Sequence, residues 1–471
     1  MGRQSNDEAS WLFRAAGLGR SIAALLPIMA VVFVAYLVIG LAMPALPLHV
    51  HQGLGLGTFV VGLVAGSQFA ATLLSRIWAG HRADTRGAKR AVVTGLLLAA
   101  LAGLLYLLSL PFLGAPLTSV TILLLGRAVL GAAESFIVAG ALVWGLARVG
   151  SHNTGTVLAQ VGTAMYVAYA IGAPAGTALY AGYGFAAIAL ATALLPLVTL
   201  LLVAPLRAVA APAHTRPPTF ASVISAVWVP GLGLALSSVG FGAITTFIVL
   251  LFAQQGWDQA WLALTLLSVA FAGGRIAFGH LPDRIGGIAV ALVCVLIEAA
   301  GQALIWLASG STLAFVGAAL SGLGYALVYP GFGVEAVRRA PPASRGLAMG
   351  TYTAFLDLAL GLASPALGLV ASGAGLGAVY LASTLVVLGA AVVALCLLVT
   401  SRMPHRDGTP VRAFTDRQIG ATGGRHETRC ARSAARRGME ALRSLAARPQ
   451  HRDARGPGRA QPDHRDALPF T

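Results

Sequence analysis

Long apolar stretches alternate with short polar or charged connections from residue 22 to residue 400. A helix of about 20 residues crosses a hydrocarbon core of roughly 30 Å, and lipid requires that its backbone groups pair within the segment. The pattern therefore predicts twelve transmembrane helices. We place them at residues 22–46, 58–79, 91–112, 118–147, 156–181, 184–206, 221–252, 258–278, 288–308, 312–337, 347–371 and 376–400.

The composition supports an all-α membrane protein. Hydrophobic residues make up 57% of the 471 residues and charged residues only 10%. Such a chain could not form a water-facing globule. The three cysteines are scattered singly, which suggests neither a disulfide framework nor a paired metal site. We also find no nucleophile–base constellation and no phosphate-binding loop, so we expect no enzyme activity, no cofactor and no metal.

Basic residues gather on one side of the predicted helices. If the N-terminus is cytoplasmic, the inner connections hold fourteen Lys and Arg residues and the outer connections hold none. The positive-inside rule predicts this asymmetry. The fourteen are Arg3, Arg14, Arg20, Arg82, Arg86, Lys89, Arg90, Arg148, Arg207, Arg216, Arg284, Arg338, Arg339 and Arg345. We therefore predict a multi-pass protein of a bacterial inner membrane with both termini in the cytosol.

Five segments follow from these patterns. A polar cytoplasmic N-terminus (1–21) precedes a first six-helix bundle (22–206), a linker rich in proline (207–220) and a second six-helix bundle (221–401). The remainder (402–471) has fifteen arginines and no sustained apolar period, which is typical of a disordered tail. Half of the net charge of +16 lies in that tail. Because the rest lies in the inner connections, we expect a lipid partner and no nucleic acid.

A dense charged segment at residues 80–90 (GHRADTRGAKR) separates two apolar stretches. It resembles the signature loop of the major facilitator superfamily, G-x-x-x-D-[RK]-x-G-[RK]-[RK], which joins the second and third helices. Thr85 stands where a basic residue is usual, and Arg86 follows one place later. The matching residues are Gly80, Asp84, Gly87, Lys89 and Arg90.

The segment recurs. Residues 76–87 align without gaps on residues 275–286 with six identities in twelve, 199 residues apart. That period is too long for a solenoid unit and fits two homologous halves related by a pseudo-two-fold axis. The resemblance implies a gating role for both copies, including Asp283 and Arg284. It also implies that Asp84 contacts the N-terminus of the helix at 347–371, where free amides favour a carboxylate.

Other segments sharpen the resemblance. Residues 36–41 (YLVIGL), 69–76 (FAATLLSR) and 350–361 (GTYTAFLDLALG) are similar to the YhhS-type bacterial branch of that superfamily, often grouped with sugar and drug efflux permeases. Residues 171–176 (IGAPAG) approximate the antiporter signature of the efflux branches. We expect Gly172, Pro174 and Gly176, and Pro365 in the related 361–368 segment, to give bendable helices that press on a partner.

Arg127 and Glu134 lie seven residues apart in one predicted helix and so on nearly one face, about 10 Å apart along the axis. The resemblance ties an arginine on this helix to proton coupling. Two interpretations remain open. The two side chains neutralise each other or neighbouring charges, or they handle a proton or the substrate.

Asp357 is a third candidate for proton coupling. It lies twelve residues beyond Arg345, about 18 Å into the bilayer, with no basic residue beside it on its own helix. An unpaired carboxyl there would stay neutral much of the time. The alternative is a protonated structural residue. We expect Arg76 and Arg275 to be interfacial anchors, with a share in the gate as the alternative. Glu298, on a helix outside the central cavity, is expected to make a packing contact.

Polar and aromatic groups on the predicted cavity-facing helices are suited to a small amphipathic or hydroxylated ligand. They are Tyr36, Gln68, Gln160, Tyr166, Tyr169, Phe241, Tyr325 and Tyr329. We expect a monomeric secondary transporter of a small organic solute, coupled to protons and working as an efflux antiporter. The alternatives are a proton symporter for uptake of a metabolite and a membrane sensor without transport.

Overall fold

The computed structural model describes residues 2–150, 154–206, 208, 220–340 and 345–402, and these residues contain helices and no strand. The first half consists of α1 (Gly2–Leu48), α2 (Thr58–Arg86), α3 (Ala88–Ser109), α4 (Pro116–Val149) and α5 (Thr154–Val203). The second half consists of α6 (Phe220–Gln255), α7 (Ala260–Phe278), α8 (Leu281–Ile285), α9 (Gly287–Trp306), α10 (Ser311–Tyr325), α11 (Val328–Arg339), α12 (Arg345–Ala374) and α13 (Leu376–Arg402).

The described helices make twelve membrane crossings, as predicted. Eleven helical segments are long and apolar enough to span a membrane, and one of them, residues 160–203, contains a break at Gly184 with φ 68° and ψ −167°. The two sides of this break are separate crossings, because 44 residues far exceed the roughly 20 that one crossing needs. The chain is therefore an all-α membrane protein with six crossings in each half.

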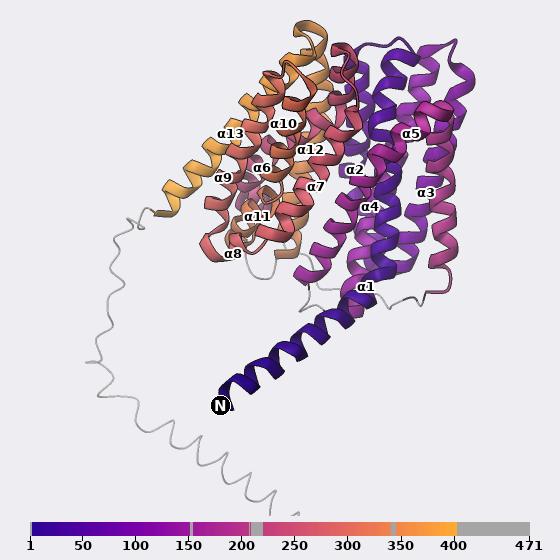
Figure 1. The fold of residues 1–471 in the computed structure, drawn as a ribbon. Coiled ribbons are helices and arrows are strands. Elements are labelled where there is room, and N and C mark those ends of the chain that lie inside the picture. The colour runs from indigo at the N-terminus through magenta and orange to yellow at the C-terminus, as the bar shows by residue number, and fades with distance from the viewer. Residues whose placement is uncertain (1, 151–153, 207, 209–219, 341–344, 403–471) are drawn as a thin grey trace, which may run out of the picture. The chain divides into compact units, whose positions relative to one another are not determined.

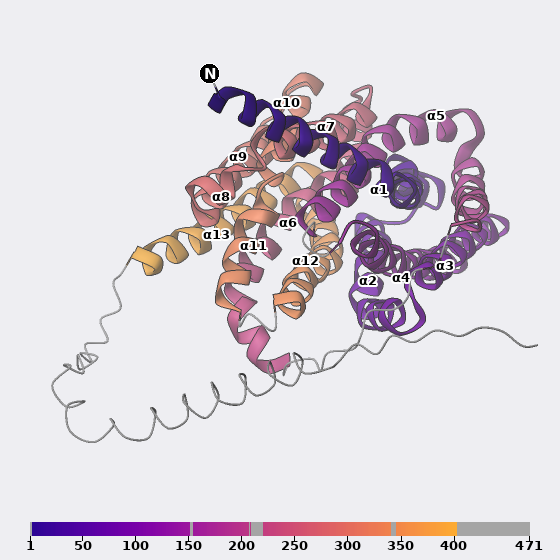
Figure 2. The same ribbon diagram turned by 90° about the horizontal axis from the view of Figure 1, so that it is seen from below.

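The two halves stand side by side in the bundle, with α2 beside α12 and α5 beside α7 (Figures 1 and 2). Twelve crossings return the chain to the side on which it started. We call this side, where α1 enters the bundle and α13 leaves it, the termini side, and the opposite side the far side (Figure 1).

The segment predicted as a loop at residues 80–90 is mostly helix. α2 continues to Arg86 and α3 begins at Ala88, so that only Gly87 separates them. Gly87 has φ 91°, and Gly286, its equivalent in the repeat, has φ 96° between α8 and α9. A residue with a Cβ is disfavoured in this conformation, which explains the glycine in both copies. The turn itself is thus repeated, as well as the sequence.

Two further helices differ clearly from their predicted bounds. α1 begins at Gly2, well before the predicted residue 22. The helix predicted at 312–337 is broken between α10 and α11. Pro330 lies in the first turn of α11 and has no N–H to donate to the preceding turn, so the helix restarts there. The predicted disordered tail lies outside the described residues except at its first residue, as does most of the predicted linker.

Candidate functional site

On the far side, α2 and α12 touch through their backbones. A Cβ added to Gly62 would stand 2.1 Å from the carbonyl oxygen of Ser364, and one added to Gly66 would stand 2.6 Å from that of Gly361. The Thr58 hydroxyl donates to the carbonyl of Gly368 at 2.9 Å. Small residues permit this approach and drive helix association in lipid. The far side is therefore closed between these two helices.

The residues expected to bend helices take part in such close contacts. Pro365 packs its ring against Gly66 of α2, 3.0 Å from a Cβ placed there. In α5, a Cβ on Gly172 or Gly176 would come within 2.8 Å or 2.2 Å of the α1 backbone at residues 40–41. Pro174 lies between them inside the helix. The structure shows the packing function of these residues, and bending during transport stays a prediction.

The same two helices, α2 and α12, separate toward the termini side. A Cβ on Gly80 of α2 or on Gly350 of α12 would meet no atom within 4 Å. Asp84 is exposed, and no hydrogen bond or ion pair joins it to a described residue. Because residues 341–344, just before α12, lie outside the described residues, the expected contact of Asp84 with this helix end stays a prediction.

The other residues of the two signature copies are at the termini side. Lys89 donates from Nζ to the carbonyls of Ala204 and Leu206, at 2.7 and 2.8 Å, just after the end of α5. Such a cation satisfies carbonyls that a helix end leaves free. It joins two helices of the first half. The exposed members are Arg86, Arg90, Asp283 and Arg284.

Asp357 is buried and forms an ion pair with Arg76 across the two halves. Nε of Arg76 lies 2.9 Å from Oδ2 of Asp357, and one terminal nitrogen of Arg76 also donates to this oxygen. The Asp357 side chain is 4% exposed and that of Arg76 is 32% exposed. The expectations of an unpaired carboxyl and of an interfacial anchor at Arg76 are both wrong. Sequence reasoning considered only neighbours on the same helix, and the partner comes from 281 residues away.

Glu134 of α4 accepts two hydrogen bonds from residues predicted to line the cavity. The Tyr36 hydroxyl of α1 donates to one carboxylate oxygen at 2.8 Å, and Nε2 of Gln68, on α2, donates to the other at 2.9 Å. Arg76 and Asp357 lie within electrostatic range of Glu134. Four helices from both halves thus place two carboxyl groups, one guanidinium and two neutral donors in a single polar cluster.

Arg127 does not join this cluster through a bond. It is 6% exposed, its Nε has no hydrogen-bond partner among the described residues, and it makes no ion pair with Glu134. Its charge acts on the hydroxyls of Tyr106 and Tyr169, with Tyr106 on α3. Both residues lie on α4, and the roughly 10 Å between them along the helix leaves Arg127 nearer the far side.

Aromatic side chains form a continuous chain from the first half to the second. Tyr36 packs edge-on to Tyr169 at 5.5 Å, and Tyr169 packs edge-on to Tyr166 at 5.9 Å. Tyr166 of α5 stacks on Phe271 of α7, with ring centroids 3.4 Å apart. Most of the residues predicted to line the cavity belong to this row of aromatic contacts.

In the second half, the row of aromatic contacts continues. Phe241 stacks on Tyr325 at 5.4 Å, and Tyr325 also contacts Phe271 at 5.9 Å. The Tyr329 hydroxyl pairs with that of Thr353, 2.8 Å away and one turn before Asp357 on α12. Gln160 is partly buried near the start of α5. Sequence reasoning missed Phe271, which a one-turn spacing before Arg275 would have indicated, and Thr353, which has the same spacing before Asp357.

Glu298 lies inside the second half and is fully buried. It accepts a hydrogen bond from the Ser237 hydroxyl of α6. Gln302, one turn later, donates to the carbonyl of Gly240 at 3.0 Å and to the Ser321 hydroxyl at 3.3 Å. These bonds tie α6, α9 and α10 together, which is consistent with the expected packing contact.

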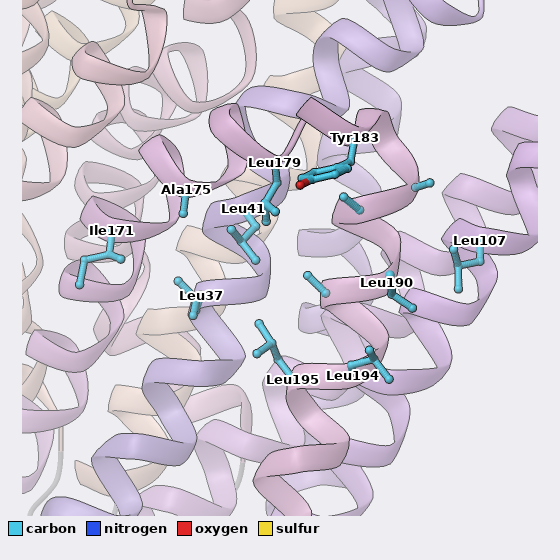
Figure 3. A pocket seen from close by; sticks show the side chains of 13 residues that line it. Leu37, Leu41, Leu107, Ile171, Ala175, Leu179, Tyr183, Leu190, Leu194 and Leu195 are labelled. Atoms are coloured by element: carbon cyan, nitrogen blue, oxygen red, sulfur yellow. The ribbon is translucent and has the colours of Figure 1, made fainter. Parts of the chain in front are cut away.

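A groove of about 770 Å³ lies on the first half, between α1, α3 and the two parts of α5 (Figure 3). Its labelled lining is leucine, isoleucine and alanine apart from Tyr183 (Figure 3). Ile171, Leu190 and Leu194 on its wall are about half exposed. Hydrocarbon chains of the bilayer suit such a surface, and the groove contains none of the charged residues of the polar cluster.

Comparisons with known proteins agree with this architecture. The family model of the Major Facilitator Superfamily matches residues 28–288 and 258–450. The uncharacterized MFS-type transporter YhhS of Escherichia coli (strain K12) is 42% identical over 374 residues, which is 79% of this chain and 91% of the relative. A similar transporter of Burkholderia pseudomallei (strain 1106a) is 41% identical over 386 residues, covering 81% and 93%.

Two solved structures share the fold at low sequence identity. The human organic anion transporter MFSD10 (TETRAN) superposes with a TM-score of 0.60 at 16% identity, covering 79% of this chain and 99% of that protein. A point mutant of the nucleoside transporter NupG gives a TM-score of 0.63 at 14% identity, with the same two coverages. These likenesses concern the fold.

Proposed function

Because this chain belongs to the major facilitator superfamily and is a multi-pass membrane transporter, we propose that it moves a small organic solute by proton-coupled alternating access. The observation that carries the proposal is the ion pair between Arg76 and Asp357. It is largely buried, it joins the two halves, and it lies where α2 and α12 begin to separate. A bond at that place can be made or broken as the halves rock.

A proton on Asp357 would release this bond. Carboxylate and guanidinium attract each other strongly in a site shielded from water, and a neutral acid loses that attraction. The charged and titratable groups facing Asp357 are Arg76 of α2, Glu134 of α4, and the hydroxyls of Tyr325 and Tyr329. Protonation would therefore free α2 from α12 and allow the two halves to exchange between the conformation open on the termini side and the one open on the far side.

Glu134 is the second proton-binding group in the proposal. Its two donors, Tyr36 and Gln68, belong to the set we assign to the solute site. A solute that displaces one of them would change how readily Glu134 holds a proton, which is the coupling that a transporter needs. Arg127 would act at longer range, by keeping a positive charge in the same half. We expect Arg127→Ala to abolish gradient-driven transport and to leave membrane insertion intact.

We propose that the protein works as an efflux antiporter and as a monomer in a bacterial inner membrane, with the termini side in the cytosol. The positive inner connections support the placement of the termini side in the cytosol. The efflux-type segment at residues 171–176 supports export. In that arrangement the structure is closed toward the outside between α2 and α12. A solute would load from the cytosol, and an external proton would drive its release.

Reconstituted liposomes test the proposal. Purified protein would be screened with sugars, organic acids and cationic drugs under an imposed pH gradient, in both directions. For a solute that is moved, we expect Asp357→Asn to keep solute counterflow and to lower gradient-driven flux by about tenfold or more, because the substitution keeps the shape and removes the titration. Asp258→Asn, in an exposed acid of the connection between α6 and α7, is the matched control and should retain both activities.

A comparison of counterflow with gradient-driven flux distinguishes the possible results. Equal retention of counterflow and gradient-driven flux in the Asp357→Asn protein would show that Asp357 does not carry the proton. The absence of flux of any screened solute in the wild-type protein, under either gradient, would contradict the transport function itself.

A further inference from the structure

The two arginines at equivalent positions of the internal repeat have different surroundings. Arg76 and Arg275 both begin the repeated twelve-residue segment, and both reach toward the other half. Arg76 bonds to Asp357 of α12. Cζ of Arg275 lies 4.0 Å from the position of a Cβ on Gly162 of α5. Where one arginine meets a carboxylate, the other meets a glycine.

Arg275 has no ion pair with any residue that the structure describes. The acidic side chains inside the bundle are engaged elsewhere. Asp357 is bonded to Arg76, Glu134 to Tyr36 and Gln68, and Glu298 to Ser237. A charge inside the bundle without a counter-charge indicates a functional position.

Arg275 does not point toward the membrane boundary. An anchor near the termini side would extend its guanidinium toward water, away from the preceding turn. Cζ of Arg275 instead lies 5.9 Å from the ring centroid of Phe271, one turn earlier on α7 and therefore deeper in the bundle. Arg275 is partly buried there. The expectation that it is an interfacial anchor is thus contradicted by its direction.

The groups around Arg275 are suited to an organic anion. Phe271, beside the guanidinium, stacks on Tyr166, and the hydroxyls of Tyr166 and Tyr329 lie within electrostatic range of the charge. A guanidinium forms two parallel hydrogen bonds with a carboxylate, sulfonate or phosphate group. Aromatic faces and hydroxyls beside it would contact a flat apolar body carrying that group.

We propose that Arg275 binds the anionic group of the transported solute, and that the substrates are small organic anions with an aromatic or apolar body. The inference rests on the proposed transport function and assigns its substrate class. A positive charge that the protein leaves unneutralised would repel cationic solutes from the same place.

Binding of matched probes to the purified full-length protein tests the assignment. The probes are benzenesulfonate and 4-hydroxybenzoate, their uncharged counterparts benzenesulfonamide and 4-hydroxybenzamide, and the cation phenyltrimethylammonium. Intrinsic fluorescence and the ligand-induced rise in unfolding temperature report binding. We expect at least one of the two anions to bind about tenfold more tightly than its amide and than the cation. If neither anion binds more tightly than its amide, the proposal is wrong.

Four variants and one control locate the effect. Arg275→Gln should remove the preference for the anion, and Arg275→Lys should restore part of it. Gly162→Asp would place a carboxylate beside Arg275, as Asp357 stands beside Arg76, and should weaken anion binding as much as Arg275→Gln. Gly162→Asn has the same shape without the charge and should stay close to the wild type. Arg345→Gln, in an exposed arginine at the start of α12, is the control for a general loss of positive charge.

Liposome flux distinguishes this inference from the function on which it rests. A wild-type protein that moves only neutral or cationic solutes under a pH gradient would overturn the anion assignment and leave the transport function standing. Anion binding that persists unchanged in both Arg275→Gln and Gly162→Asp would overturn the role of Arg275.

Discussion

The two halves meet at two interfaces that the internal repeat makes equivalent, and the two are built differently. At the α2/α12 interface, glycines bring backbones together and an arginine is neutralised by a buried aspartate. At the α5/α7 interface, two aromatic rings stack and the equivalent arginine faces a glycine. A duplicated scaffold has thus kept one charge and lost or never gained its counter-charge. We infer that the first interface serves switching and the second serves solute recognition.

The largest expected effect is at the ion pair. Arg76→Leu leaves Asp357 buried without its partner, where it must either stay charged or take up a proton, and we expect a loss of about 3–5 kcal/mol of unfolding free energy above neutral pH. The double variant Arg76→Leu/Asp357→Leu should recover most of that loss, because no uncompensated charge remains. Unfolding by denaturant in detergent measures both. Equal stability of the single and double variants would show that the pair contributes little.

The glycine contacts on the far side come next. Gly62→Ala places a methyl group 2.1 Å from a backbone oxygen of α12, so the two helices must separate. We expect a loss of roughly 1–3 kcal/mol and greater reactivity of cysteines introduced near residue 58, since overpacking favours the conformation open on the far side. Gly80→Ala, on the same helix, meets no atom within 4 Å and is the control. Unchanged cysteine reactivity in Gly62→Ala would contradict a seal at this point.

An effect of similar size is expected within the polar cluster. Tyr36→Phe removes one of the two donors to Glu134, and we expect a loss of about 1.5–3 kcal/mol if the carboxyl is ionised and about half as much if it is protonated. The size of the loss at several pH values therefore reports the charge on Glu134. Tyr183→Phe, in an exposed ring, controls for loss of a phenol hydroxyl. A loss that does not vary with pH would exclude titration of Glu134 in that range.

The smallest effect concerns the end of α5. Lys89→Met removes the donor to two carbonyls after this helix, and we expect a loss of about 0.3–1 kcal/mol because the site is partly solvated. Arg90→Met, in the exposed neighbour, should be close to neutral. Unfolding midpoints in detergent compare the two. An effect of Arg90→Met as large as that of Lys89→Met would attribute it to net charge alone.

The fold could be predicted well from the sequence because the bilayer leaves few alternatives. Hydropathy indicated the number of crossings, and the repeat indicated the two halves. Bounds were wrong where local chemistry overrides hydropathy, as at Gly87, which alone separates two helices, and at Pro330, which breaks one. Both residues can be read in the sequence. Hydropathy averaged over a window of residues, however, does not detect a single glycine or proline that ends a helix.

The site could be predicted only in part. Arg127 and Glu134 lie on one helix, as predicted, and several aromatic residues assigned to the cavity contact one another. The partner of Asp357 could not be found by spacing, because it depends on how two halves separated by a linker dock. For the same reason the two arginines, which begin the same repeated segment, looked alike until their surroundings were known.

The glycine contacts of α2 have a further consequence for the energy supply of the cell. A chain of water molecules can conduct protons through a membrane protein, and each molecule needs a gap of about its own volume. At Gly62 the space is already too small for one added carbon atom, so no water can stand between the helices there. The seal between α2 and α12 thus depends on the absence of a methyl group. We expect Gly62→Ala to let protons leak across the membrane, and so to dissipate the proton gradient, before it stops solute transport.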